Sequence, residues 1–296
     1  MRGIVTGGAG FLGSHVADHL ARSGHEIVVY DAKRTDRHAC VVGDLLDPAA
    51  LRAAFGGMDF VCHLGAIGDV YLAAEQPALA ASVNAAGTAN VCDAALAAKL
   101  GRVVVASTWE VYGEPKYQPL DEQHPCEPDH PYNITKLAGE RLALAYAHLR
   151  GLPVVALRLG TAFGTRMRPN SVFSVFIRRA LAGEPITIQG SGQQGRQFTH
   201  ASDIASGFEA ALRRGTMGEA YNLVAERMVT IRELAELVTT IVPTELTYGD
   251  ARPGDVPSAT VSSARAATDL GWAARMEFDA GLREIVVEAR AALAAR

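Results

Sequence analysis

Residues 4–13, which read Ile4-Val5-Thr6-Gly7-Gly8-Ala9-Gly10-Phe11-Leu12-Gly13, decide the fold of this chain. An apolar strand runs into a glycine-rich turn, and a helical pattern follows from Ser14. The turn satisfies both G-x-G-x-x-G and the overlapping T-G-x-x-G-x-x-G. A side chain in such a turn would keep the backbone away from a pyrophosphate, and the following helix N-terminus offers free N–H groups. Because Asp31 ends the next apolar strand, the stretch predicts a dinucleotide site rather than an ordinary tight turn.

Length and composition exclude several classes of protein. The 296 residues allow one large domain or two small ones. A net charge of −4 gives no electrostatic reason to expect nucleic acid or an anionic membrane as a partner. No apolar run approaches the ~18 residues of a membrane-spanning helix, and the chain enters a strand at once, so we expect no signal peptide. The four cysteines lack a C-x-x-C pair, so we expect a cytoplasmic protein without disulfides or a bound metal.

Strand and helix patterns alternate through the first half of the chain. This alternation predicts an α/β fold, a doubly wound parallel (Rossmann) sheet with helices on both faces and ligands beyond the carboxyl ends of the strands. The expected strands are 2–6, 26–30, 40–43, 60–64, 102–106 and 153–159, and the expected helices are 14–23, a helix from Pro48, 79–100 and 132–150.

The alternation weakens after residue 165. We therefore expect residues 1–165 to form the dinucleotide-binding domain. Residues 166–296 are expected to form mainly a smaller α/β substrate-binding lobe, with some segments returning to the first domain. This part shows short strand-like pieces at 186–188 and 197–200, helical patterns at 170–183, 202–214 and 230–241, and two terminal helices. Thr230 is the expected cap of the 230–241 helix.

Two local patterns bear on the cofactor and on assembly. Asp31 favours NAD over NADP, because a carboxylate there accepts hydrogen bonds from the adenosine ribose hydroxyls. Lys33 and Arg34 follow it, and in the alternative interpretation they would hold the 2′-phosphate of NADP. We expect NAD. The 79–100 helix is apolar on almost every face, so it must be covered by the monomer core or by a second subunit, and we expect a homodimer.

Polar groups follow the fifth expected strand, where the ligand should lie. The segment from Ser107 to Gly113 reads S-T-W-E-V-Y-G and places hydroxyl and carboxylate groups at a carboxyl strand end. Tyr132 and Lys136 are four residues apart in the next helix and so share one of its faces. The Y-x-x-x-K pattern is weak by itself, and its position after this strand is what makes it informative.

Six motifs occur in order along nearly the whole chain. They are TGGAGFLGSH at 6–15, STWEVYG at 107–113, YNITKLAGE at 132–140, LRLGTAFG at 157–164, GRQFTHASDIA at 195–205 and RPGDV at 252–256. Together they resemble the extended short-chain dehydrogenase/reductases of the NAD-dependent epimerase/dehydratase group, which are nucleotide-sugar enzymes.

The resemblance implies an NAD site assembled from several strand ends. One of the implied residues, Asn84, has an alternative interpretation as a buried, hydrogen-bonded structural residue rather than a cofactor contact. The residues implied are Gly7, Gly10, Phe11, Leu12 and Gly13 at the pyrophosphate, Asp31 at the ribose, Asp44 and Leu45 at the adenine, Leu64, Gly65 and Ala66 along the cofactor, and Asn84, Tyr132 and Lys136 toward the nicotinamide.

The resemblance also implies a catalytic set. Tyr132 would be the base, Lys136 its partner, and Thr108 would hydrogen-bond the sugar hydroxyl. The phenol has an ordinary pKa of ~10, so we expect the Lys136 ammonium and the nicotinamide ring to lower it. The phenolate would take the hydroxyl proton while hydride passes to NAD, which leaves a sugar oxidised at C4.

The implied substrate contacts lie in the second half of the chain. Arg196 and Arg252 match arginines that grip the nucleotide diphosphate, although a lone arginine is equally well a surface ion pair. Gln189 and Phe198 fall where the family contacts the nucleobase and its ribose. Thr161 stands where the family often has an asparagine that faces the substrate phosphate.

The segment around Glu110 bears on the reaction outcome. A glutamate here resembles 4,6-dehydratases and uronate decarboxylases, where it works as an acid or base, whereas many epimerases carry a small residue. Trp109 replaces the aspartate that one dehydratase class uses to protonate the leaving hydroxyl. We expect a UDP-sugar 4-epimerase first, because that reaction needs only Thr108, Tyr132, Lys136 and NAD. A decarboxylase or dehydratase that uses Glu110 is the alternative, and a non-catalytic NAD(P)-binding regulator or a simple NADP-dependent reductase are more distant ones.

Overall fold

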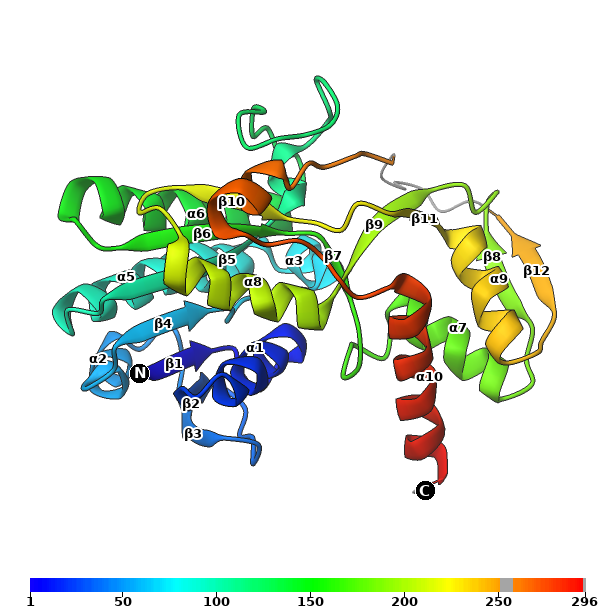
Figure 1. The fold of residues 1–296 in the computed structure, drawn as a ribbon, viewed down its shortest axis with the longest axis horizontal. Coiled ribbons are helices and arrows are strands. Elements are labelled where there is room, and N and C mark those ends of the chain that lie inside the picture. Colours follow the sequence, from blue (N-terminus) through cyan, green and yellow to red (C-terminus); the bar gives the residue numbers. More distant parts are fainter. Residues whose placement is uncertain (251–257, 295–296) are drawn as a thin grey trace.

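The computed structural model, which describes residues 1–250 and 258–294, contains a seven-stranded sheet with helices on both faces (Figure 1). Neighbouring strands of this sheet are parallel. Their order across the sheet is β10-β6-β5-β4-β1-β2-β3. Strands β2 and β3 are added on one side of β1, whereas β4 and the strands beyond it lie on the other side, so the switch point is between β1 and β4. The predicted doubly wound parallel sheet is therefore confirmed. The strands are β1 Arg2–Thr6, β2 Glu26–Asp31, β3 Ala39–Val42, β4 Phe60–His63, β5 Arg102–Thr108, β6 Val154–Leu159 and β10 Ala220–Leu223.

Two helical layers bury the faces of this sheet (Figure 1). The inner strands are apolar on both faces, as strands covered from both sides must be. Their side chains divide into two cores, one under each layer. One layer contains α1 Phe11–Arg22 and α8 Ala201–Arg214, and the other contains α2 Pro48–Phe55, α5 Gly87–Ala97 and α6 Pro131–Arg150. The caps suit the sequence: Asp47 accepts from two backbone amides at the start of α2, and His130 caps α6.

Strand β10 was not predicted from the sequence. It is four residues long and lacks a clear apolar alternation, since Asn222 lies in its middle. It nevertheless pairs with β6, and Tyr221 and Leu223 are fully buried. Asn222 is also buried, and its amide oxygen accepts a hydrogen bond from the Tyr112 hydroxyl at 2.7 Å. A distant tyrosine therefore allows a polar residue inside this strand, and no local pattern reports that partner.

A smaller region of the fold extends from one end of the large sheet (Figure 1). In the described part of the chain, β9 Gly195–His200 lies between β7 Thr161–Phe163 and β11 Met228–Thr230, while β8 Ile186–Gln189 pairs with β12 Leu246–Gly249. The helices here are α7 Val172–Leu181, α9 Ile231–Ile241 and α10 Phe278–Ala294. Thr230 accepts a hydrogen bond from the Glu233 amide at 3.0 Å, which confirms the predicted cap. The domain boundary at residue 165 stays a prediction, because β7 precedes it whereas α8 and β10 return to the large sheet.

The expected 79–100 helix is divided. It consists of α4 Pro77–Ala81, a wider π-type turn at Ser82–Ala86, and α5. The monomer core already buries much of α5, including Val91 and Cys92. The homodimer therefore stays a prediction. The four cysteines are unpaired, as expected. Among the described helices, none combines the length and apolar character that crossing a bilayer requires.

Candidate active site

The glycine turn between β1 and α1 is bare of side chains and tightly built. Gly7 has a φ of +72°, and a Cβ on it would lie 2.5 Å from the Gly65 amide nitrogen. A Cβ on Gly13 would collide with the Gly7 carbonyl oxygen. Gly10 donates to that same oxygen at 3.0 Å and starts α1 without a side-chain cap. This cradle fits a pyrophosphate at the helix N-terminus.

The other predicted adenosine contacts lie beside this turn. Asp31 accepts from the amide of Ala9 at 3.0 Å and from that of Lys33 at 2.9 Å, so it joins the turn to the end of β2. The Asp44 carbonyl accepts from the Tyr30 hydroxyl at 2.8 Å. Among the remaining predicted residues, Phe11 and Leu12 open α1, and Leu45, Leu64, Gly65 and Ala66 lie around the switch point between β1 and β4.

His63, which the sequence reasoning missed, connects this turn to the opposite helical layer. Its Nδ1 lies 2.6 Å from the Thr6 hydroxyl and its Nε2 lies 3.0 Å from the Thr88 hydroxyl. Because Thr88 donates its own proton to the Asn84 carbonyl, Nε2 must carry the imidazole proton. Burial lowers the pKa of His63 to about 3, with the Lys136 charge adding to the effect, so the ring stays neutral. Its signal in the sequence is a polar residue ending an apolar strand.

Asn84 occupies the π-type turn and is fully enclosed by protein. Its amide oxygen accepts from the Ile67 amide at 2.8 Å, and its amide nitrogen donates to the Ile67 carbonyl and the Thr135 hydroxyl. Thr135 in turn donates to the Tyr132 carbonyl at 2.9 Å. Asn84 thus fastens the segment after β4 to the start of α6, which matches its structural alternative.

The end of β5 and the start of α6 bring the predicted catalytic residues together. Lys136 is buried, and its ammonium donates to the Ala106 carbonyl at 2.7 Å. Thr108 and Glu110 both lie close enough to the Tyr132 phenol to act on its pKa, which Thr108 lowers and Glu110 raises. The sequence shows only how far apart these residues are along the chain, and the fold brings them to the carboxyl edge of the sheet.

Burial and nearby charges set the electrostatics of Tyr132. Burial raises the pKa of the phenol above its ordinary value and Glu110 raises it further, while Arg168 and the Thr108 hydroxyl lower it. Burial also lowers the pKa of Lys136 to about 8. The upward effects outweigh the Arg168 charge in the protein without its cofactor, so the lowering expected from Lys136 together with the nicotinamide ring stays a prediction.

Glu110 and Arg168 complete the charges around the phenol. Burial raises the pKa of Glu110, and Arg196 works against that rise. Arg168 donates to Asp69 at 3.0 Å, which joins the loop after β7 to the N-terminus of α3 Val70–Glu75. Arg168 was not among the predicted residues; its signal is an arginine in the Gly/Thr/Arg-rich stretch 160–169.

The structure brings some of the predicted substrate residues to this edge. Thr161 and Arg196 line one small hollow with Trp109. Gln189 ends β8 on the far side of the smaller region. The Phe198 ring is buried among other phenylalanines, so its side chain belongs to the core. Arg252 lies outside the described residues.

Comparison with known proteins extends the resemblance. A model of the NAD dependent epimerase/dehydratase family matches residues 4–223. The chain is 30% identical to a dTDP-glucose 4,6-dehydratase of Actinoplanes over 98% of this chain and 98% of that protein. It is 31% identical to UDP-glucuronic acid decarboxylase 1 of Danio rerio over 96% of this chain and 71% of that protein. A crystal structure of UDP-glucose 4-epimerase from Thermotoga maritima with UDP-glucose superimposes with a TM-score of 0.94, at 28% identity, over 99% of this chain and 100% of that chain.

These relatives span three reaction outcomes that share one cofactor and one class of substrate. The matched region contains the glycine turn, Thr108, Tyr132 and Lys136, and it covers most of the chain. The chain belongs to the NAD-dependent epimerase/dehydratase family of nucleotide-sugar enzymes.

Proposed function

We propose that the protein is a 4-epimerase of a UDP-sugar. The observation that carries this proposal is that Tyr132, Thr108 and Lys136 gather at the carboxyl end of β5, on the same edge of the sheet as the glycine turn after β1. Epimerisation at C4 needs no further protein group. The UDP-glucose bound to the Thermotoga epimerase supports a UDP-sugar as the substrate.

The residues divide the work as follows. The bare glycine turn and Asp31 would hold NAD, and the chemistry that NAD supplies when bound is reversible hydride acceptance from the sugar C4. Tyr132 takes the C4 hydroxyl proton and later returns it. Thr108 orients that hydroxyl, and the Lys136 ammonium favours the phenolate. Arg196, which lines a small hollow with Thr161 and Trp109, would bind the substrate diphosphate.

Glu110 supports a second candidate, a uronate decarboxylase or a 4,6-dehydratase. Its carboxyl is withdrawn from water beside Tyr132, and burial raises its pKa, as suits a group that exchanges protons. Trp109, by contrast, packs into a cluster with Tyr112 and Leu120, so position 109 supplies no proton donor. A dehydratase of this kind would have to rely on Glu110 alone.

Product analysis separates the candidates. The protein is incubated with NAD and, separately, UDP-glucose, UDP-glucuronate and dTDP-glucose. A new isomer of unchanged mass supports the epimerase. Loss of carbon dioxide identifies a decarboxylase, and loss of water identifies a dehydratase. Failure to convert any nucleotide sugar, with NAD bound and the fold intact, would contradict the proposal.

Glu110→Gln should keep epimerase turnover but move its pH dependence. Glu110 raises the pKa of Tyr132, so removing its charge lowers that pKa, and the acidic limb of kcat against pH shifts to lower pH. Glu114→Gln, an exposed change four residues further on, should leave the profile in place. Loss of all product from a folded Glu110→Gln protein would favour the second candidate.

Arg168→Gln should move the same limb the other way. Arg168 lowers the pKa of Tyr132, so its loss should raise the phenol pKa, and it also removes the ion pair with Asp69. The acidic limb then shifts to higher pH. Arg213→Gln, which removes an exposed partner of Glu209 on α8, is the control. A profile that is unchanged in Arg168→Gln would rule out this influence on the phenol.

A further inference from the structure

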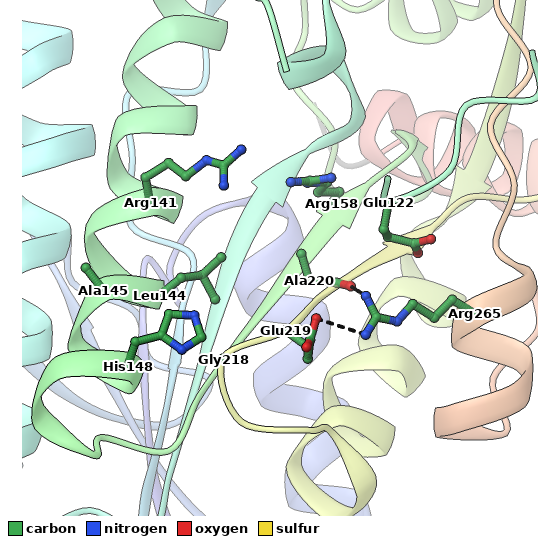
Figure 2. Close-up of a pocket in the computed structure, with 10 residues that line it drawn as sticks. All are labelled: Glu122, Arg141, Leu144, Ala145, His148, Arg158, Gly218, Glu219, Ala220 and Arg265. Carbon is green, nitrogen blue, oxygen red and sulfur yellow. Dashed lines mark hydrogen bonds and ion pairs between the residues drawn. The ribbon is translucent and has the colours of Figure 1, made fainter. Parts of the chain in front are cut away.

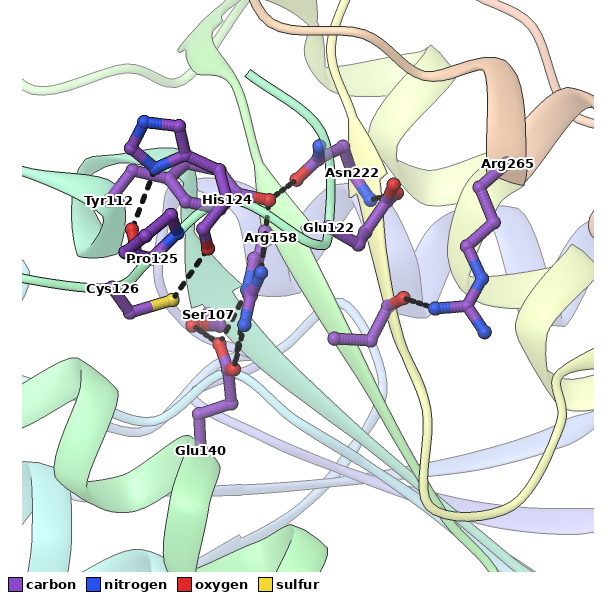
Figure 3. Close-up of polar contacts among 11 residues, drawn as sticks. Ser107, Tyr112, Glu122, His124, Pro125, Cys126, Glu140, Arg158, Asn222 and Arg265 are labelled. Atoms are coloured by element: carbon purple, nitrogen blue, oxygen red, sulfur yellow. Dashed lines mark hydrogen bonds and ion pairs between the residues drawn. The ribbon is translucent and has the colours of Figure 1, made fainter. Parts of the chain in front are cut away.

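Behind the catalytic helix lies a buried ion network that the reaction as described does not use (Figure 3). Glu140 on α6 accepts from the Ser107 hydroxyl at 2.5 Å and from Arg158 at 2.6 Å. The side chains of Glu140 and Arg158 are only 0% and 4% exposed. Ser107 immediately precedes Thr108, so the network reaches the strand end that carries the site.

Arg158 is itself held from its other side. It donates to the Tyr112 hydroxyl at 2.9 Å, and that hydroxyl donates to Asn222 on β10. The guanidinium also lies 4.9 Å from the centre of the Tyr112 ring. A buried ion pair is a weak source of stability, because desolvation offsets most of its attraction. Its location is therefore the better guide to its role.

That location is one helical turn from Lys136. Residues four apart on a helix are neighbours, and the two side chains reach consecutive residues of β5, because Lys136 donates to the Ala106 carbonyl and Glu140 accepts from the Ser107 hydroxyl. Glu140 raises the pKa of Lys136 while burial lowers it to about 8. The other groups around the ammonium are Tyr132 on the same helix, the neutral His63 from β4, and the Ala106 carbonyl from β5. Among these side chains, Glu140 is the anion whose charge acts on Lys136.

We propose that Glu140, fixed by Arg158 and Ser107, is a positioning residue that keeps Lys136 protonated and aligned against the end of β5. The consequence for catalysis rests on the proposed function, because it assumes that the Lys136 ammonium assists Tyr132. Arg158 has two effects in this arrangement. It holds the carboxylate in place, and it partly offsets the attraction between Glu140 and Lys136.

The charge of Lys136 can be measured without any substrate. The chain has four lysines, Lys33, Lys99, Lys116 and Lys136, so NMR of isotope-labelled lysine in the NAD-bound protein gives few signals. A Lys136→Met protein assigns the signal of interest. Glu140→Gln keeps the size of the side chain but removes its charge and one of its two acceptor oxygens, and it should lower the Lys136 midpoint by about one pH unit or more.

Matched variants separate charge from packing. Ser107→Ala removes a hydrogen bond to Glu140 but no charge, so it should shift the Lys136 midpoint by less than Glu140→Gln does. Arg158 and Arg265 both line a cavity of about 300 Å³ (Figure 2). Arg265 pairs with Glu219 rather than with Glu140, so Arg265→Gln should leave the midpoint in place.

Glu140→Gln leaves Arg158 buried without its partner and so risks unfolding. The double variant Glu140→Gln, Arg158→Gln removes both charges, and it should lower the midpoint by less than the single change does. In the kinetic assay, the alkaline limb of kcat should move to lower pH in step with the Lys136 midpoint. KM should change less than kcat.

The result that overturns the inference is an unchanged Lys136 midpoint in a folded Glu140→Gln protein or in the double variant. An equal shift in Ser107→Ala would also overturn it, because packing would then explain the effect. The proposed function is tested separately, because it fails if the wild-type protein forms no epimer. In that case the NMR titration still tests whether Glu140 controls the charge of Lys136, because it needs no substrate.

Discussion

Replacing Tyr132 with phenylalanine is expected to abolish turnover while leaving the fold and NAD binding intact. The phenol is the group that takes and returns the C4 proton, and removing a general base costs about 10²–10⁴-fold in rate. The phenylalanine keeps the ring, so the packing around position 132 should be preserved. Epimer formation, followed by separation of the two sugar isomers, measures the effect, and NAD retention is measured on the same sample.

Tyr146→Phe is the matched control for this prediction. Tyr146 lies on the same helix, and its hydroxyl donates to Asp93 at 2.7 Å, away from the end of β5. Its loss should leave turnover near that of the wild type. Wild-type turnover in Tyr132→Phe, with Tyr146→Phe equally active, would remove the phenol from the mechanism.

The second large effect is expected from Gly13→Ala. Its Cβ would collide with the Gly7 carbonyl oxygen, so the turn must shift and the amides that face the pyrophosphate are displaced. Overpacking of this kind costs about 1–3 kcal/mol, which corresponds to roughly 5- to 150-fold in NAD affinity if it falls on binding. Calorimetric titration with NAD measures the affinity, and thermal unfolding measures any part that falls on stability.

Gly56→Ala provides the comparison. Gly56 ends α2 with a φ of −58°, and a Cβ there would meet only the Ala53 carbonyl oxygen at 3.5 Å, an ordinary contact. This variant should bind NAD like the wild type. Unchanged affinity and unchanged stability in Gly13→Ala would show that the turn is not the close-packed cradle described here.

Local patterns predicted the parts of the site that one segment can specify. The glycine turn, Asp31 at the end of β2 and the Tyr132/Lys136 pair each depend on a few consecutive residues, and the strand and helix that present them were predicted within a few residues. The substrate residues were less accessible to such reasoning. The core position of the Phe198 ring arises from contacts with Phe173 and Phe278, which no pattern around residue 198 reveals.

By itself, the sequence determined a doubly wound sheet with a dinucleotide turn and a tyrosine–lysine helix after the fifth strand. Only the tertiary structure decided how those groups are charged and held. The raised pKa of Tyr132 comes from burial and from Glu110, and the Glu140 carboxylate that acts on Lys136 is held by Arg158 on β6. The physical reason is that periodicity and glycine spacing act along the chain. Desolvation and ion pairing instead depend on which distant segments close around a group, and that is known only once the chain has folded.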